Sequence, residues 1–263
     1  MQSLSQIDLH VFIGLLVAAA CAGWIDAVAG GGGLIQLPAL LLGLGAQPPA
    51  TILGTNKLSS VIGTSAATAT YLRRRDARPD FRSASSMAAS AFVGSMAGAS
   101  LATRVPANVF RPLVLVLLVL VGVWTLLRPE LGHTEKLRWT SGPTHLAIIS
   151  LAGLVIGFYD GIFGPGTGSF LVFILVGVIG YSFLRASATA KIVNLGTNIA
   201  ALVVFVPAHH VLVPLGLAMG SCNLLGGVIG AHMASLRGSE FVRKAFLVVV
   251  AIMIAKLGWD QFR

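Results

Sequence analysis

The fold is decided by the stretch Gly23-Trp24-Ile25-Asp26-Ala27-Val28-Ala29-Gly30-Gly31-Gly32-Gly33, which has a counterpart later in the chain. At an offset of 134 positions (160 − 26) lies Gly157-Phe158-Tyr159-Asp160-Gly161-Ile162-Phe163-Gly164-Pro165-Gly166-Thr167-Gly168. The same offset pairs Thr55 with Thr189 and Lys57 with Lys191. So many matches at one offset indicate an internal duplication of about half the protein.

The composition places the chain in a membrane. Hydrophobic residues make up 56% of its 263 residues, charged residues make up 10%, and the mean hydropathy is +0.87. Soluble domains carry about 25% charged residues, so the sequence predicts an all-α, polytopic protein with about 8–10 spans in a lipid bilayer. The net charge of +9 is attributed to membrane topology rather than to a nucleic-acid partner.

The predicted spans repeat their order in the two halves. The first repeat of transmembrane helices is expected over residues 1–134 and the second over residues 135–263. The short segments 34–44 and 168–180 either cross the membrane fully or dip in and return. The ten predicted segments are residues 10–29, 34–44, 51–72, 83–103, 113–127, 145–163, 168–180, 185–206, 212–236 and 245–259.

The basic loops indicate how the repeats are oriented. If all ten segments cross, the loops 73–82, 128–138 and 237–244 share one side with Arg185, and the opposite side holds Arg104, Arg111 and Arg263. The positive-inside rule makes the basic side cytoplasmic. Five crossings in each half then make the repeats antiparallel. If the short segments only dip in, loop 237–244 moves to the outside and fits the rule less well.

Each half contains a glycine-rich break, and inverted repeats with such breaks are typical of secondary transporters. Glycine permits positive φ angles and lets backbone N–H groups turn toward an anion. The candidate binding positions in the breaks are Gly31, Gly32, Gly33, Gly166, Thr167 and Gly168. The alternative is that these glycines serve only close helix packing.

Lys57 and Lys191 lie in the middle of equivalent segments, where a lysine costs about 2.5–3.5 kcal/mol on insertion scales. Such residues usually face a cavity or a charged partner. A cationic, hydroxyl- and amide-lined site suits a small oxyanion, and replacing either lysine by alanine is expected to abolish transport while the protein still folds. The polar neighbours assigned to this site are Thr55, Asn56, Ser60, Thr189, Asn194 and Asn198.

Asp26 and Asp160 have two interpretations. A carboxyl group in a low-dielectric environment can hold a proton at accessible pH, which makes both residues candidates for proton coupling. Alternatively, they neutralise the lysines as structural ion pairs or cap the glycine turns, and the two roles can coexist. No nucleophile elbow, P-loop, CxxC motif or metal-spaced carboxylate pair occurs, so the sequence predicts no enzyme, cofactor or metal site.

These motifs resemble the sulfite exporter TauE/SafE family. The first half contributes Asp26-x-x-x-Gly30-Gly31-Gly32-Gly33-Leu34-Ile35 and Gly54-Thr55-Asn56-Lys57-Leu58, followed by Arg73-Arg74-Arg75. The second half contributes the stretch from Gly157 to Ser169 and Arg185-Ala186-Ser187-Ala188-Thr189-Ala190-Lys191. Because Pro165 and Thr167 replace two glycines in the second motif, the two half-sites are not expected to be chemically identical.

The resemblance implies a bacterial or archaeal inner-membrane permease for small sulfur-containing anions such as sulfite, sulfonates or sulfoacids, generally moving them outward. The expected mechanism is a proton-coupled secondary transporter working by alternating access. One alternative is a gated anion channel. The other is a membrane subunit that delivers sulfur species to a partner protein. The sequence is compatible with a homo-oligomer.

Overall fold

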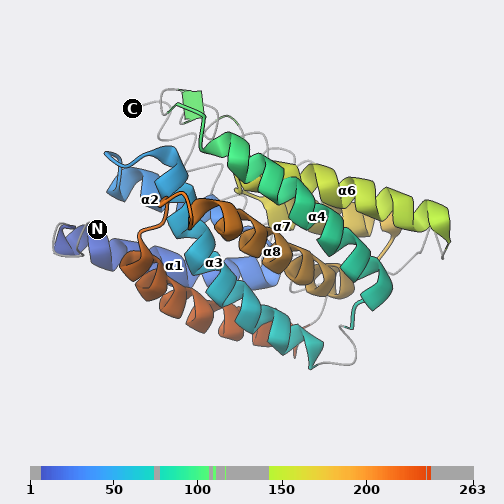
Figure 1. Ribbon diagram of the computed structural model, residues 1–263. Helices are drawn as coiled ribbons and strands as arrows, with labels where there is room; N and C mark the ends of the chain where they lie inside the picture. Colours follow the sequence, from blue (N-terminus) through green and yellow to red (C-terminus); the bar gives the residue numbers. More distant parts are fainter. Residues whose placement is uncertain are drawn as a thin grey trace.

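The computed structural model describes residues 7–73, 78–106, 109–110, 116, 142–234 and 236–237, and every regular element in these residues is helical. The prediction of an all-α fold is therefore confirmed. The predicted spans 113–127 and 245–259 lie outside the described residues except for Val116, as do the loop 128–138 and the loop 237–244 except for Arg237. The helices are α1 (Leu9–Ala29), α2 (Gly33–Gly43), α3 (Pro49–Leu72), α4 (Phe81–Ala102), α6 (Pro143–Ile162), α7 (Thr167–Ile174) with the π-helical turn η2 (Leu175–Ile179), α8 (Phe183–Phe205) and the unlabelled helix Val213–Ala234 (Figure 1).

Helix length and hydropathy confirm the polytopic membrane protein. In the described part, α1, α6, α8 and Val213–Ala234 are long and apolar enough to span a membrane. Helices α3 and α4 have 24 and 22 residues, but polar and small side chains lower their hydropathy. On α1, Leu9, Ile13 and Val17 recur every four residues and are exposed, so this face of the helix is suited to contact lipid.

The helices recur in order along the chain. The starts of α6, α7 and α8 each lie 134 positions after those of α1, α2 and α3 (143 − 9, 167 − 33 and 183 − 49). In Figure 1, α1 and α6 run in opposite directions, and so do α3 and α8. Both observations support the predicted inverted repeats. The division between residues 134 and 135 lies outside the described residues and stays a prediction.

Each short helix runs back along the bundle toward the end at which the preceding long helix begins. Helix α2 has 11 residues, about 16 Å at 1.5 Å per residue, against a hydrocarbon core of about 30 Å. A Cβ on Gly43, at the end of α2, would lie 2.9 Å from Cγ1 of Val11, near the start of α1. The two helices thus form a hairpin. Likewise, η2 ends just before α8, which begins at the same end of the bundle as α6 (Figure 1).

Whether the short segments 34–44 and 168–180 cross the bilayer fully or dip in and return stays a prediction. At the turn between the two helices, Gly30 takes the left-handed conformation (φ 79°) and its N–H donates to the carbonyl of Asp26, which ends α1. Because α1 and α2 run antiparallel, α3 begins at the end of the bundle at which α1 begins. The ten-crossing scheme gives the same orientation for α3 and the helices that follow it.

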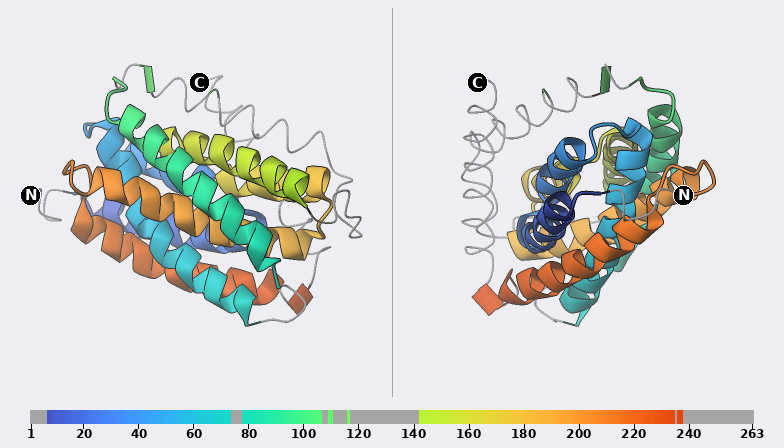
Figure 2. Two further views of the ribbon diagram at one scale, coloured as in Figure 1. Left: turned by 45° about the vertical axis from the view of Figure 1, so that its right-hand side comes forward. Right: turned by 90° about the vertical axis from the view of Figure 1, so that its left-hand side faces the viewer.

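Each half packs one of its helices against the first helix of the other half. Helix α4 packs on α6, where a Cβ on Gly94 would lie 2.2 Å from the carbonyl oxygen of Leu154. The helix Val213–Ala234 packs on α1, where a Cβ on Gly226 would lie 2.0 Å from the carbonyl oxygen of Ala20. Each glycine has a second one four residues on, the spacing that lets helix backbones approach closely. Figure 2 shows both helix pairs along the sides of the bundle.

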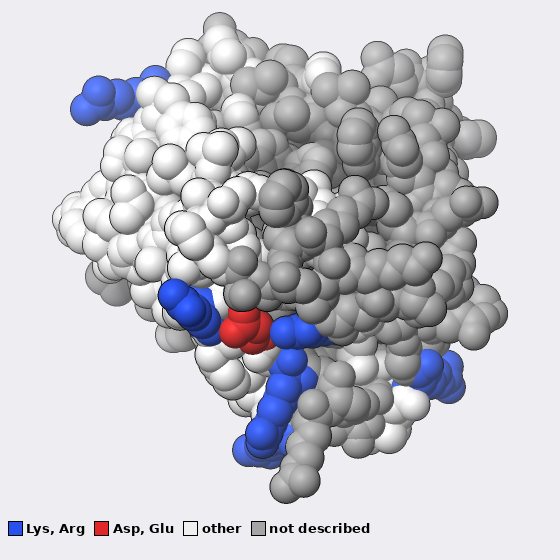
Figure 3. Space-filling view, turned by 90° about the vertical axis from the view of Figure 1, so that its right-hand side faces the viewer, with Lys and Arg blue, Asp and Glu red and all other residues white. Residues whose placement is uncertain are grey.

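Arginines collect at the end of the bundle where α3 and Val213–Ala234 end and α4 and α8 begin. Figure 3 views this end, with basic side chains around an acidic one. Arg104 follows α4 at the opposite end. This grouping agrees with the predicted sharing of one side by the basic loops. The described arginines at this end are Arg73, Arg78, Arg82, Arg185 and Arg237.

Asp80 caps α4 at this end. Its Oδ1 accepts from the N–H of Arg82 at 3.2 Å, and its Oδ2 accepts from the hydroxyl of Ser83 at 2.5 Å. Because the single hydroxyl proton of Ser83 is used for Asp80, Ser83 accepts from Nε2 of His145 at 2.8 Å. This chain of bonds joins the start of α4 to the start of α6. The hydrogen bond from Ser83 lowers the pKa of Asp80 below its ordinary value of 3.8.

The Asp80→Ala variant is expected to lose about 1 kcal/mol of stability at neutral pH, the usual cost of removing an N-cap. A carboxyl whose pKa is lowered by folding stabilises the protein above its unfolded pKa and loses this effect as the pH falls through the folded pKa. The difference from wild type should therefore shrink below pH 3.8. Thermal unfolding in detergent across acid pH measures it. Asp80→Asn, which keeps the capping oxygen, should lose the pH dependence and retain most of the stability; an equal loss in both variants would contradict the capping role.

Candidate functional site

The two glycine-rich breaks touch each other. A Cβ on Gly168 would lie 2.3 Å from the carbonyl oxygen of Gly30, and a Cβ on Gly30 would lie 2.4 Å from the carbonyl carbon of Gly168. Gly33 likewise approaches the backbone of Gly164. No side chain fits at the crossing of Gly30 and Gly168, so glycine is required there for close backbone approach. The crossing brings the ends of α1 and α6 to one place.

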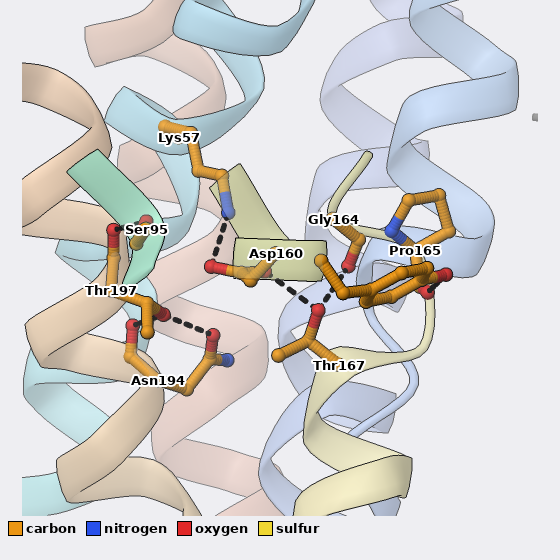
Figure 4. Close-up of polar contacts among 9 residues, drawn as sticks. Lys57, Ser95, Asp160, Gly164, Pro165, Thr167, Asn194 and Thr197 are labelled. Carbon is orange, nitrogen blue, oxygen red and sulfur yellow. Dashed lines mark hydrogen bonds and ion pairs between the residues drawn. The ribbon is translucent and has the colours of Figure 1, made fainter. Parts of the chain in front are cut away.

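Two ion pairs join the halves at this crossing. Nζ of Lys57 on α3 lies 2.5 Å from Oδ2 of Asp160 on α6, and Nζ of Lys191 on α8 lies 2.7 Å from Oδ2 of Asp26 on α1 (Figure 4 shows the first pair). Each lysine therefore pairs with the aspartate of the other half. The exposed fraction of the side chain is 2% for Lys57 and Asp160, 0% for Lys191 and 14% for Asp26. Removing one partner of such a pair leaves a buried, uncompensated charge.

A small polar cavity lies between the pairs. The space that the centre of a water molecule can occupy in it is about 20 Å³, which is room for about one water molecule. Most of the residues that the sequence assigned to the site line this cavity. They are Asp26, Gly32, Gly33, Asn56, Lys57, Ser60, Asp160, Thr167, Gly168, Asn194 and Asn198.

Five assigned residues do not line the cavity. Thr55 accepts the N–H of Leu212 at 3.0 Å and donates to a carbonyl of its own helix. Thr189 donates to a carbonyl within α8. Gly166 takes φ 77° as the N-cap of α7, and Gly31 packs near the side chains of other residues. The ammonium group of Lys191 is paired with Asp26, and of these two residues only Asp26 lines the cavity.

Hydroxyl and amide groups hold the second half of the site in place. Thr167 donates to Oδ1 of Asp160 at 2.7 Å and approaches the carbonyl oxygen of Gly164 at 2.9 Å. Thr197 contacts the backbone and side chain of Asn194, and its own carbonyl accepts from Ser95 on α4 (Figure 4). Asp160 and Asn194 are thus fixed by neighbours from several elements.

The cavity also offers unused hydrogen-bonding groups. Nδ2 of Asn198 and Oδ1 of Asn56 are buried and have no hydrogen-bond partner among the described residues. Both residues line the cavity. One amide can donate and the other can accept, as a bound oxyanion carrying a proton or hydroxyl group would require.

Four lining residues were missed by the sequence assignment: Gly30, Thr64, Gly164 and Asn223. The duplication carried a signal for three of them, because Gly30 pairs with Gly164, and Thr64 lies 134 positions before Asn198. Asn223, on Val213–Ala234, donates to Oε1 of Gln36 at 2.8 Å. At the same offset, Gln36 has an apolar counterpart, so the repeat gave no indication of this amide pair.

The described residues contain no group of three or more His, Cys, Asp or Glu side chains that could hold a metal ion. His210, in the loop after α8, contacts the hydroxyl of Thr51 at 3.3 Å. The chemistry available at the crossing is therefore that of two ammonium groups, two carboxylates, amides and hydroxyls.

A family profile described as sulfite exporter TauE/SafE matches residues 15–257. The chain belongs to this family. It is 38% identical over 253 residues to a probable membrane transporter protein, ORF9, of Sinorhizobium sp., covering 96% of this chain and 94% of the relative. It is 36% identical to the probable membrane transporter protein YfcA of Escherichia coli (strain K12), covering 94% and 89%. A probable membrane transporter protein of Haemophilus influenzae is 34% identical, covering 96% and 98%.

The resemblance noted from the two motifs is thereby confirmed over most of the chain. No solved structure matches the TauE/SafE chain. The profile and the relatives' names indicate a multi-pass membrane transporter, in agreement with the long apolar helices. They do not specify an anion for this TauE/SafE chain.

Proposed function

We propose that this TauE/SafE protein is a secondary transporter that exports small sulfur-containing anions, such as sulfite, sulfonates or sulfoacids, across the bacterial cytoplasmic membrane. The observation that carries the proposal is the pair of buried lysines, each held by an aspartate of the other half, beside a polar cavity. Lysines inside a membrane protein are rare and usually mark a substrate or ion pathway.

The anion is bound by charge and by hydrogen bonds together. Lys57 lines the cavity and supplies positive charge, while Asn198 offers an unpaired amide donor. An oxyanion of three or four oxygen atoms is small enough to use several donors at once. Because the described cavity has room for about one water molecule, a sulfur oxyanion enters only after the cavity widens. This supports alternating access, since the site lies where the two halves meet.

We assign the arginine-rich end of the bundle to the cytoplasm by the positive-inside rule. Arg73, Arg82 and Arg237 are exposed there, where they also raise the local concentration of anions at the entrance used for export.

Thermal unfolding of the purified protein in detergent, with sulfite, thiosulfate, sulfate, sulfoacetate or taurine, tests the substrate class. A ligand at a hundredfold excess over its Kd is expected to stabilise the protein by about 2.7 kcal/mol, and chloride at equal ionic strength should not. An equal shift with chloride, or no shift with any sulfur anion, would overturn the substrate class. Counterflow of radiolabelled sulfite in proteoliposomes then tests the mechanism, because a channel shows no counterflow.

A further inference from the structure

The two ion pairs are not equivalent. Asp160 is bound at both oxygens, by Nζ of Lys57 at Oδ2 and by the hydroxyl of Thr167 at Oδ1, and only 2% of its side chain is exposed. Among the described residues, the side chain of Asp26 accepts hydrogen bonds only at Oδ2, from Lys191 at 2.7 Å and from Thr64 at 3.5 Å. Its side chain is 14% exposed.

The sequence explains this difference. The position equivalent to Thr167 in the first half is Gly33 (167 − 134), which has no hydroxyl to donate to Asp26. Asp160 is therefore held at both oxygens by Lys57 and Thr167, while Asp26 is held at one oxygen and its second donor, Thr64, lies at 3.5 Å. Less has to be broken to release Asp26.

The lysines differ in the same sense. Both lysines are buried, but Lys57 lines the cavity, whereas on the other side the cavity is lined by Asp26 and not by its partner Lys191. An anion in the cavity can approach Lys57 while the Lys57–Asp160 pair stays closed. It reaches Lys191 only when the side chain of Asp26 moves aside.

We propose that Asp26 carries a coupled proton and shields Lys191 from the cavity. The Lys191–Asp26 pair opens when an anion binds, while the Lys57–Asp160 pair stays closed. This proposal rests on the proposed transport of an anion. A carboxylate separated from its lysine inside the membrane is costly, and protonation removes the charge. Proton binding at Asp26 and anion binding at Lys191 therefore favour each other, as linkage requires.

The charges balance at each step. With the pair closed, Lys191 and Asp26 together have no net charge. The Asp26 carboxylate takes one proton from the aqueous side to which the site is open, and one monovalent anion binds the freed Nζ of Lys191, so the net charge is again zero. After the halves have moved, anion and proton leave on the other side and the pair closes. One proton accompanies each such anion in the same direction.

Other titratable groups near Asp26 are few among the described residues. Lys57 and Asp160 line the same cavity. Tyr71 on α3 donates to the carbonyl of Ala27 at 2.8 Å. Helices α2 and α7 contribute none, and His232 on Val213–Ala234 is exposed.

The test uses the full-length protein in proteoliposomes, with radiolabelled sulfite and a pH-sensitive dye in the lumen. The Asp26→Asn variant is expected to lower the unfolding temperature, because buried Lys191 loses its counter-charge, and in the sulfite counterflow that remains the protons moved per anion are expected to fall from about one to near zero. Because sulfite itself exchanges protons with the buffer, the comparison with wild type decides. Asp160→Asn is the matched control. It is expected to lower the unfolding temperature, and it should not exchange sulfite without moving protons.

Each outcome decides one point. Proton movement in Asp26→Asn equal to that in wild type, or uncoupled exchange in Asp160→Asn instead, would overturn the assignment of Asp26. Wild-type protein without saturable sulfite counterflow would overturn the proposed function rather than this assignment. If Asp26→Asn fails to give a monodisperse protein, Asp26→Glu in the same assay takes its place. It should retain coupling, and loss of coupling with counterflow intact would contradict the proposal.

Discussion

The Lys57→Met variant is expected to transport no anion and to lose about 3–5 kcal/mol of stability, the usual cost of breaking a buried ion pair from one side. Asp160 would keep its hydrogen bond from Thr167 but would have lost its counter-charge, with 2% of its side chain exposed. Sulfite flux in proteoliposomes and thermal unfolding in detergent measure the two effects. The sequence alone predicted loss of transport with an intact fold, and the buried pair adds the loss of stability.

The double variant Lys57→Met/Asp160→Asn separates fold from function. Replacing both charges removes the uncompensated carboxylate, and buried pairs replaced in this way are often neutral or stabilising. We expect stability within about 1 kcal/mol of wild type and still no transport, because the cation that faces the cavity is absent. Sulfite flux in the double variant would contradict the role of Lys57 in binding.

The Gly30→Ala variant is expected to lose about 2–5 kcal/mol and to transport no anion. Gly30 has φ 79°, where an alanine costs about 1–2 kcal/mol. Its Cβ would also lie 2.4 Å from the backbone of Gly168, and such overpacking typically costs about 1–3 kcal/mol. Backbone atoms cannot rotate away as a side chain can, so the two breaks would have to separate. Thermal unfolding and sulfite flux again provide the measurement.

Gly14→Ala is the matched control. Gly14 lies in the same helix, and a Cβ there would meet nothing within 4 Å. Since alanine is favoured over glycine inside a helix by up to about 1 kcal/mol, this variant should be as stable as wild type or more so, with unchanged transport. A comparable loss in both variants would show that α1 tolerates no substitution, and the crossing would then not explain the effect.

The duplication made much of the site predictable because it places the same residue type at equivalent positions in both halves. One aspartate or lysine in an apolar segment is weak evidence, but Asp26 with Asp160 and Lys57 with Lys191 at one offset indicate a shared function. The offset says which residues are equivalent. It does not say which residues touch, so the exchange of partners between the halves became visible only in three dimensions.

Other features could not be predicted from the duplication. The amide pair of Asn223 and Gln36 has no polar counterpart, and the hairpin of α1 and α2 depends on the direction the chain takes after Gly30. That direction is set by the packing of α2 on α1, where Gly43 approaches Val11, and not by a local sequence pattern. Thr55 and Thr189 match at the offset, yet both hydroxyls bond to backbone carbonyls of their own helices.

The exchange of ion-pair partners has a consequence for synthesis at the ribosome. Lys57 lies 103 positions before its partner, and Asp26 lies 165 positions before its own. The first three helices therefore leave the translocon with two opposite charges whose counter-charges have not yet been made. Both charges therefore remain without their native partners until α6 and α8 have been inserted. A chain truncated before α6 should accordingly be cleared by membrane proteases, and co-expression of the missing portion should rescue it.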